Sequence, residues 1–169
     1  GSFSTTMRVG TNTLTSAGST DAFYASGTQA GAFSSSQGFG GTLADAATSV
    51  DSSTTQIFVG GSFQDAANLG DAIRVSAGSS DVFVVAIARS TSVVEWSATG
   101  GGTGADVLYG VVSGPDGYPV LAGSFSGAAT FGSTALTSVG GLDAFLARAT
   151  SGATFSGASR SGGASDDVV

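Results

Sequence analysis

The sequence contains no histidine, no cysteine and no lysine. Without His and Cys, a zinc site of the usual kind, a thiolate nucleophile, an imidazole base and a redox-active dithiol are all excluded. Serine and threonine are abundant, but a nucleophilic hydroxyl needs a neighbouring base that neither His nor Lys is present to supply. Paired acids for glycoside hydrolysis remain open, without a motif that nominates any pair. We therefore expect a protein that is not an enzyme and that uses no cofactor and no metal.

Charge is also scarce: charged residues make up 10% of the chain, and its five cations, all arginine, are outnumbered by 12 acids. The net charge of −7 argues against nucleic acid or an anionic membrane surface as a partner, because both require clustered cations. No apolar run reaches the roughly 18 residues of a membrane-spanning helix, so we expect no membrane insertion. The lack of Cys excludes disulfide bonds but not export.

Small and hydroxylated residues dominate what is present. Gly, Ser, Thr and Ala account for 101 of the 169 residues, and there are only two prolines. Such a bias is typical of linkers, but here Val, Ile, Leu and 11 Phe recur through it at regular positions. The chain is therefore predicted to be ordered β structure.

The sequence repeats itself with a period of about 61 residues. A Gly-Ser-Phe triplet begins at positions 1, 61 and 123, and an Asp-x-Phe triplet begins at 21, 81 and 143. A further glycine and an aspartate that follows a Gly-Gly pair recur in the same order. The repeat residues are Gly1, Phe3, Gly10, Asp21, Phe23 and Asp45 in repeat 1 (1–60, beginning mid-blade); Gly61, Phe63, Gly70, Asp81, Phe83 and Asp106 in repeat 2 (61–122); and Gly123, Phe125, Gly132, Asp143, Phe145 and Asp167 in repeat 3 (123–169, truncated mid-blade).

Four short strands are predicted within one period, over 107–112, 118–125, 143–148 and 154–159, with a loop carrying Phe131-Gly132 between the second and third. Residues 82–88 are apolar without alternation, which favours a strand buried on both faces. This pattern predicts an all-β fold of tandem four-stranded antiparallel blades, about three propeller-like repeats. Propellers close with typically 4 to 8 blades, so three cannot close within this chain.

The order of these motifs resembles the bacterial β-propeller repeats called SBBP repeats. The resemblance covers essentially the whole chain and is best from Gly123-Ser124-Phe125 to Phe131-Gly132 and at Asp143-Ala144-Phe145. It implies four-stranded blades in secreted or surface-attached bacterial proteins, with no family-wide catalytic residues. This sequence departs from the pattern where Trp96 alone is the tryptophan of a fourth strand and where Arg74 replaces a leucine.

Each candidate site has a structural interpretation beside the functional one. The repeated aspartates have the chemistry of calcium ligands, but they lack dense metal-loop spacing, and we favour caps on strand-entry turns. The glycine-rich stretch 100–104 is not followed by Lys or a helix, which disfavours phosphate binding. Aromatic side chains suit sugar stacking as well as core packing, and we favour the core. These aromatics are Trp96, Tyr109, Tyr24 and Tyr118.

Two function classes remain. The first is an extracellular structural or adhesive protein, a subunit or segment of a surface assembly or filament, whose partner is itself or flanking repeats. The alternative is a glycan-binding β-propeller module, with surface glycans as partners. Three periods exceed the chain by about one hairpin, so we expect that the isolated chain is not a self-sufficient monomer and that its terminal strands pair across a boundary.

Overall fold

The computed structural model describes all of residues 1–169 and contains fifteen β-strands and no helix, which confirms the predicted all-β class. The strands are β1 (Ser2–Phe3), β2 (Thr6–Val9), β3 (Asn12–Thr15), β4 (Asp21–Gly27), β5 (Phe33–Gly41), β6 (Ala46–Ser52), β7 (Gln56–Phe63), β8 (Ala66–Asn68), β9 (Ile73–Val75), β10 (Asp81–Ala88), β11 (Val94–Gly102), β12 (Val107–Ser113), β13 (Pro119–Phe131), β14 (Thr134–Thr150) and β15 (Thr154–Ser161).

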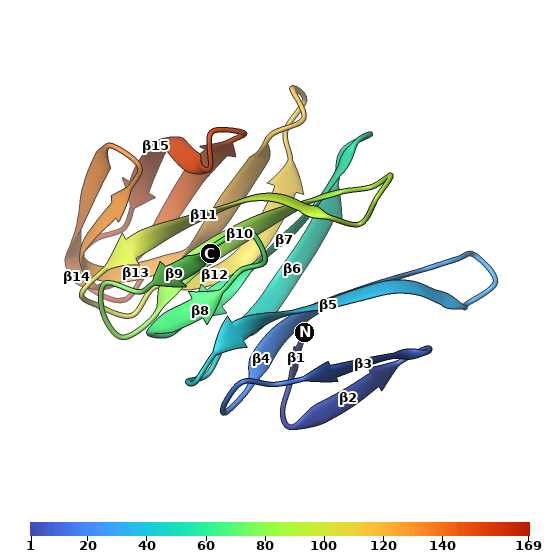
Figure 1. The fold of residues 1–169 in the computed structure, drawn as a ribbon. Helices are drawn as coiled ribbons and strands as arrows, with labels where there is room; N and C mark the ends of the chain where they lie inside the picture. The colour runs from blue at the N-terminus through green and yellow to red at the C-terminus, as the bar shows by residue number, and fades with distance from the viewer.

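The strands form three successive sets, which Figure 1 shows from the blue N-terminal end to the orange and red C-terminal end. In the second set (β6–β11), β6, β7, β10 and β11 pair in that order as an antiparallel meander. The third set (β12–β15) repeats this arrangement with its four strands. The first set (β1–β5) has β1, β4 and β5 in the corresponding places. By hydrogen bonding the strands form a five-stranded sheet (β1-β4-β5-β8-β9), an eight-stranded sheet (β15-β14-β13-β11-β10-β7-β6, with β12 beside β13) and the two-stranded sheet β2-β3. The arrangement is curled, and the propeller architecture stays a prediction.

A hairpin lies between the second and third strands of each set. It is β2–β3 in the first set and β8–β9 in the second, whereas β13 and β14 simply continue into it in the third. The loop predicted around Phe131-Gly132 is therefore wrong. Gly132 supplies only the turn, with φ of +62°, and the flanking residues satisfy their backbone groups by pairing across the hairpin.

The same edge contact joins each set to the next. β5 pairs with β8 at the first junction, between the first and second sets, and β11 pairs with β13 at the second junction. The contact residues on β5 are Gly40 and Gly41, and those on β11 are Gly101 and Gly102. Because equivalent residues meet at both junctions, the sets follow one another by one repeated step.

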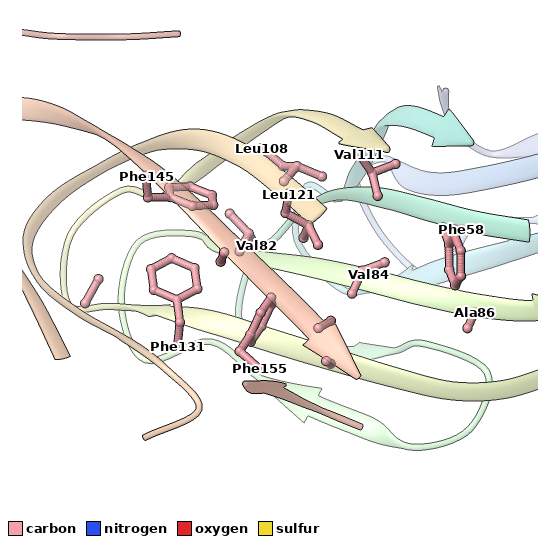
Figure 2. Packing of buried hydrophobic residues seen from close by; sticks show 14 of the residues in the cluster. Phe58, Val82, Val84, Ala86, Leu108, Val111, Leu121, Phe131, Phe145 and Phe155 are labelled. Carbon is pink, nitrogen blue, oxygen red and sulfur yellow. The ribbon is translucent and has the colours of Figure 1, made fainter. Parts of the chain in front are cut away.

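β10 is buried along its whole length, as the apolar run 82–88 predicts. Its alternate side chains belong to two different cores, because successive residues of a strand point to opposite faces. Phe83, Val85 and Ile87 belong to the first junction core, which also contains Tyr24 and Phe39 of the first set. The other face belongs to the second junction core, shown in Figure 2, which includes Val82, Val84, Ala86, Phe58, Leu108, Val111, Leu121, Phe131, Phe145 and Phe155. The middle set is thus sandwiched between its neighbours.

Candidate functional site

The first series of repeated aspartates accepts hydrogen bonds from the backbone beside the hairpins. Asp21 begins β4, Asp81 begins β10 and Asp143 lies within β14. In each, Oδ2 accepts a hydrogen bond at 3.0 Å from the backbone N–H of the residue four positions earlier. All three are buried. Asp21 and Asp81 thus cap strand-entry turns, as the capping interpretation predicts, whereas Asp143 makes the equivalent bond inside the continuous strand β14.

The second series lies after the Gly-Gly pairs and caps the next turn. Oδ2 of Asp45, Asp106 and Asp167 accepts a hydrogen bond at 2.7 Å from the N–H of the second glycine of the pair. Oδ1 of Asp45 also accepts the N–H of Gln64 at 3.0 Å. Oδ1 of Asp106 is buried and has no hydrogen-bond partner. Asp45 and Asp106, which lie at the two junctions, therefore differ in how fully they are satisfied.

The two series converge on the first glycine of each pair. A Cβ added to Gly101 would lie 2.5 Å from Asp106 Oδ2 and 2.7 Å from Asp81 Cγ, and the φ of this glycine is +150°. Gly40 is placed in the same way between Asp21 and Asp45, each within 2.7 Å of the added Cβ. Only glycine fits here, because any side chain would occupy the space between the carboxylates.

Burial shapes the charge of these carboxyl groups. It raises the pKa of Asp45 and of Asp81, and it raises the pKa of Asp106 to about 6, with the neighbouring charge of Asp81 adding to the effect. Burial acts to raise the pKa of Asp143 as well, but Arg160 outweighs it and the pKa falls below its ordinary value. Arg160 Nη1 lies 2.6 Å from Asp143 Oδ2.

The other repeated glycines lie where chains approach closely or turn. A side chain on Gly61 would collide with the carbonyl of Ala46, and one on Gly123 with the carbonyl of Val107, so each lets the first strand of its set lie against the second. Gly1 faces the ring of Phe23. The remaining repeated glycines have positive φ. Gly10 and Gly132 lie in the turns of the hairpins of the first and third sets, and Gly70 lies just after β8.

The six phenylalanines of the repeated triplets lie on the second and third strands of their sets. In the first and second sets the two rings meet edge to face, with centroids 6.1 and 6.3 Å apart. In the third set Phe145 packs on Phe131 instead, at 4.7 Å. All six are buried except the half-buried Phe23: Phe3, Phe63, Phe83, Phe125 and Phe145.

A ladder of polar contacts between β6, β7 and β12 was not predicted from the sequence. Val111 N–H donates to Ser49 Oγ at 3.0 Å, and Ser113 N–H donates to Asp51 Oδ2 at 2.7 Å. Leu108 also takes part, since its N–H donates to Ser62 Oγ and its carbonyl accepts from Thr48 Oγ1. Side chains of the second set thereby satisfy the backbone of the third. The sequence feature that could have indicated these contacts is the repeat period, because the two longest-range bonds join residues 62 positions apart.

The outer face of the first set is apolar and uncovered. Phe33 on β5 pairs with Gly27 of β4 and is 60% exposed. Phe155 on β15 pairs with Ala149 of β14 in the equivalent position, yet it is only 3% exposed. The phenylalanine that is buried at this position in the third set is thus exposed to solvent in the first set. A separate hollow of about 230 Å³ lies between this set and the second set, lined by Phe23, Tyr24 and Ala25 of β4 and by residues 47–50 of β6.

The aromatic side chains weighed as sugar platforms are mostly occupied. Trp96 and Tyr24 are buried in the junction cores. The hydroxyl of Tyr109 bonds Ser124 Oγ at 3.1 Å, and Arg148 lies over the ring of Tyr118 at 5.4 Å. The largest groove, of about 700 Å³ between the 51–54 and 113–117 turns, is lined entirely by polar residues, Gly and Pro, without an aromatic side chain.

The glycine-rich stretch 100–104 is likewise committed to the junction. Gly101 and Gly102 pair with β13, and the N–H of Gly102 is donated to Asp106. No three His, Cys, Asp or Glu side chains gather closely enough to hold a metal ion. The structure contains no helix with the length and apolar character needed to cross a membrane.

Comparison with known proteins adds no relative: no protein-family model matches the chain, and no curated protein matches it.

Proposed function

We propose that this chain is a structural or adhesive repeat module of an extracellular bacterial surface, built from propeller-like four-stranded blades and acting as a subunit or segment of a larger assembly. The observation that carries the proposal is the repeated stacking of strand sets. The same glycine contacts and carboxylate caps occur at both junctions, and each junction buries an apolar core. The SBBP-type resemblance of the sequence supports the same proposal.

The outer face of the first set supports an assembly role. Phe33 is exposed where its equivalent, Phe155, is buried by the preceding set. Covering an apolar side chain of this size is favourable by about 1.5–3 kcal/mol, so a further set of the same kind stabilises the face when it docks there. A second copy of the chain, or flanking repeats, would supply that set.

No enzymatic activity is assigned, because the chain has no histidine or lysine to activate its hydroxyl groups and no motif nominates a pair of acids. The glycan-binding alternative has less support, since Trp96 and Tyr24 are buried and the polar groove offers no stacking surface.

Sedimentation velocity over a range of concentrations tests the assembly role. We expect the wild-type chain to associate, and Phe33→Ser to weaken the association. Ile73→Ser is the matched control, because Ile73 is 70% exposed but lies on the β8–β9 hairpin, away from the outer face. A wild-type chain that stays monomeric throughout, or an Ile73→Ser variant that dissociates as readily as Phe33→Ser, would contradict the proposal.

A further inference from the structure

The three sets satisfy their junction carboxylates in three different ways. At the first junction, Asp45 receives two backbone N–H groups, from Gly41 and Gln64. In the third set, Asp143 receives the guanidinium of Arg160. At the second junction, Asp81 accepts the backbone N–H of Ala77 and Asp106 accepts that of Gly102. The backbone of Ser126 also acts to lower the pKa of Asp106, but burial outweighs it, and neither carboxylate receives a cation. The second junction therefore has neither the hydrogen bond that Gln64 donates to Asp45 nor the guanidinium that Arg160 brings to Asp143.

The geometry of the second junction brings its two carboxylates together in a buried space. Both lie against Gly101, within 2.8 Å of the position of an added Cβ. Asp81 is 5% exposed and Asp106 is fully buried, and Oδ1 of each is without a hydrogen-bond partner. A buried carboxylate oxygen without a donor is costly, and two neighbouring carboxylates resist ionising together.

No cation of the chain reaches this pair. The elements packed around it carry Asp65, before β8, Arg74 on β9 and Glu95 on β11; Arg74 binds Asp71 and Ser97, and Glu95 accepts from Gln56. The five arginines all bond elsewhere: Arg8 to Gly10, Arg74 to Asp71, Arg89 to Ser52 and Ser53, Arg148 to Asp116, and Arg160 to Asp143.

We propose that the Asp81–Asp106 pair holds one proton in mildly acidic solution, and that this proton does at the second junction what Arg160 does in the third set. With the proton bound, the pair carries one negative charge instead of two. The junction between the second and third sets is then more stable in mild acid than at neutral pH. Because burial raises the pKa of Asp106 to about 6 from its ordinary 3.8, the proton is lost as the pH rises through about 6.

The position of Arg160 indicates where a substitute for the proton belongs. Arg160 lies opposite Phe145 on β15, and Thr99 lies opposite Phe83 on β11 in the same register. Thr99→Arg would therefore place a guanidinium beside Asp81, as Arg160 lies beside Asp143. Asp106→Asn removes the titrating group by another route and keeps an oxygen to accept the N–H of Gly102.

The test is urea unfolding between pH 4.5 and 7.5, followed by the fluorescence of Trp96, the only tryptophan. A change in pKa of about two units corresponds to about a hundredfold change in the ratio of folded to unfolded protein, so we expect the wild-type ratio to rise by up to about that factor on acidification. Asp106→Asn and Thr99→Arg should each flatten this dependence. The exposed Asp65 provides the control Asp65→Asn, which should retain it.

Carboxyl-carbon NMR of the wild-type protein keeps the proposal falsifiable if a variant fails to fold. We expect the side-chain carboxyl of Asp81 or Asp106 to titrate well above pH 4. Titration of both below pH 4, or an Asp106→Asn variant with the full wild-type pH dependence, would overturn the proposal.

Discussion

Truncating Phe83 tests whether the first junction core holds the sets together. Phe83 is fully buried on β10, where its ring meets that of Phe63 edge to face at 6.3 Å. It belongs to the cluster that contains Tyr24 and Phe39 of the first set, so Phe83→Ala leaves a cavity between two sets. Buried Phe→Ala substitutions cost about 3–5 kcal/mol. That is a large fraction of the 5–15 kcal/mol by which domains are typically stable.

The magnitude should be visible in both chemical and thermal unfolding. At roughly 2–4 °C per kcal/mol for a chain of this size, the midpoint of Phe83→Ala should fall by about 6–20 °C. Phe33→Ala is the matched control, since it removes the same atoms from a side chain that is 60% exposed, and it should change the free energy of unfolding by less than about 0.5 kcal/mol. If the free energy of unfolding of Phe83→Ala lies within about 1 kcal/mol of the wild-type value, the first junction core does not provide the stability assigned to it.

Three other predictions concern the junctions. Gly101→Ala should destabilise the protein by about 1–3 kcal/mol in thermal unfolding, because its Cβ would enter the space between two carboxylates at a φ of +150°. The control Gly110→Ala, with nothing within 4 Å of the added Cβ, should leave stability unchanged, and equal effects of the two substitutions would refute the argument. Ser49→Ala leaves the N–H of Val111 without its acceptor and should cost about 1–3 kcal/mol by urea unfolding, unlike the exposed Ser4→Ala. Stability should fall below about pH 4, because Arg160 holds the pKa of Asp143 below its ordinary value despite burial, and the stability that a lowered pKa provides is lost when the carboxylate is protonated. Arg160→Gln should weaken this loss of stability in acid, and an Arg160→Gln variant that loses stability below about pH 4 as the wild type does would contradict the prediction.

Much of the local structure was predictable from the sequence. The apolar run 82–88 predicted a strand buried on both faces, because a strand with one solvent face alternates between apolar and polar residues. The recurring aspartates predicted backbone caps, because a short carboxylate after a turn reaches nearby N–H groups without help from distant residues. The hairpin at Gly132 was missed, since a Phe-Gly pair signals a turn whether or not the flanking residues pair with each other.

The hydrogen bonding and the charge of the junction carboxylates were decided by the tertiary structure. Asp81 and Asp106 have the same repeat landmarks as Asp21 and Asp45, yet only folding shows that Gln64 satisfies Asp45 while Asp106 keeps a buried oxygen without a donor. The sequence by itself determined the four main strands of a period and the period, because these depend on local backbone preference and on the pattern of apolar side chains. The charge balance of a buried carboxylate depends on which donors and cations the packing of distant strands brings within about 3 Å, and no local pattern contains that information.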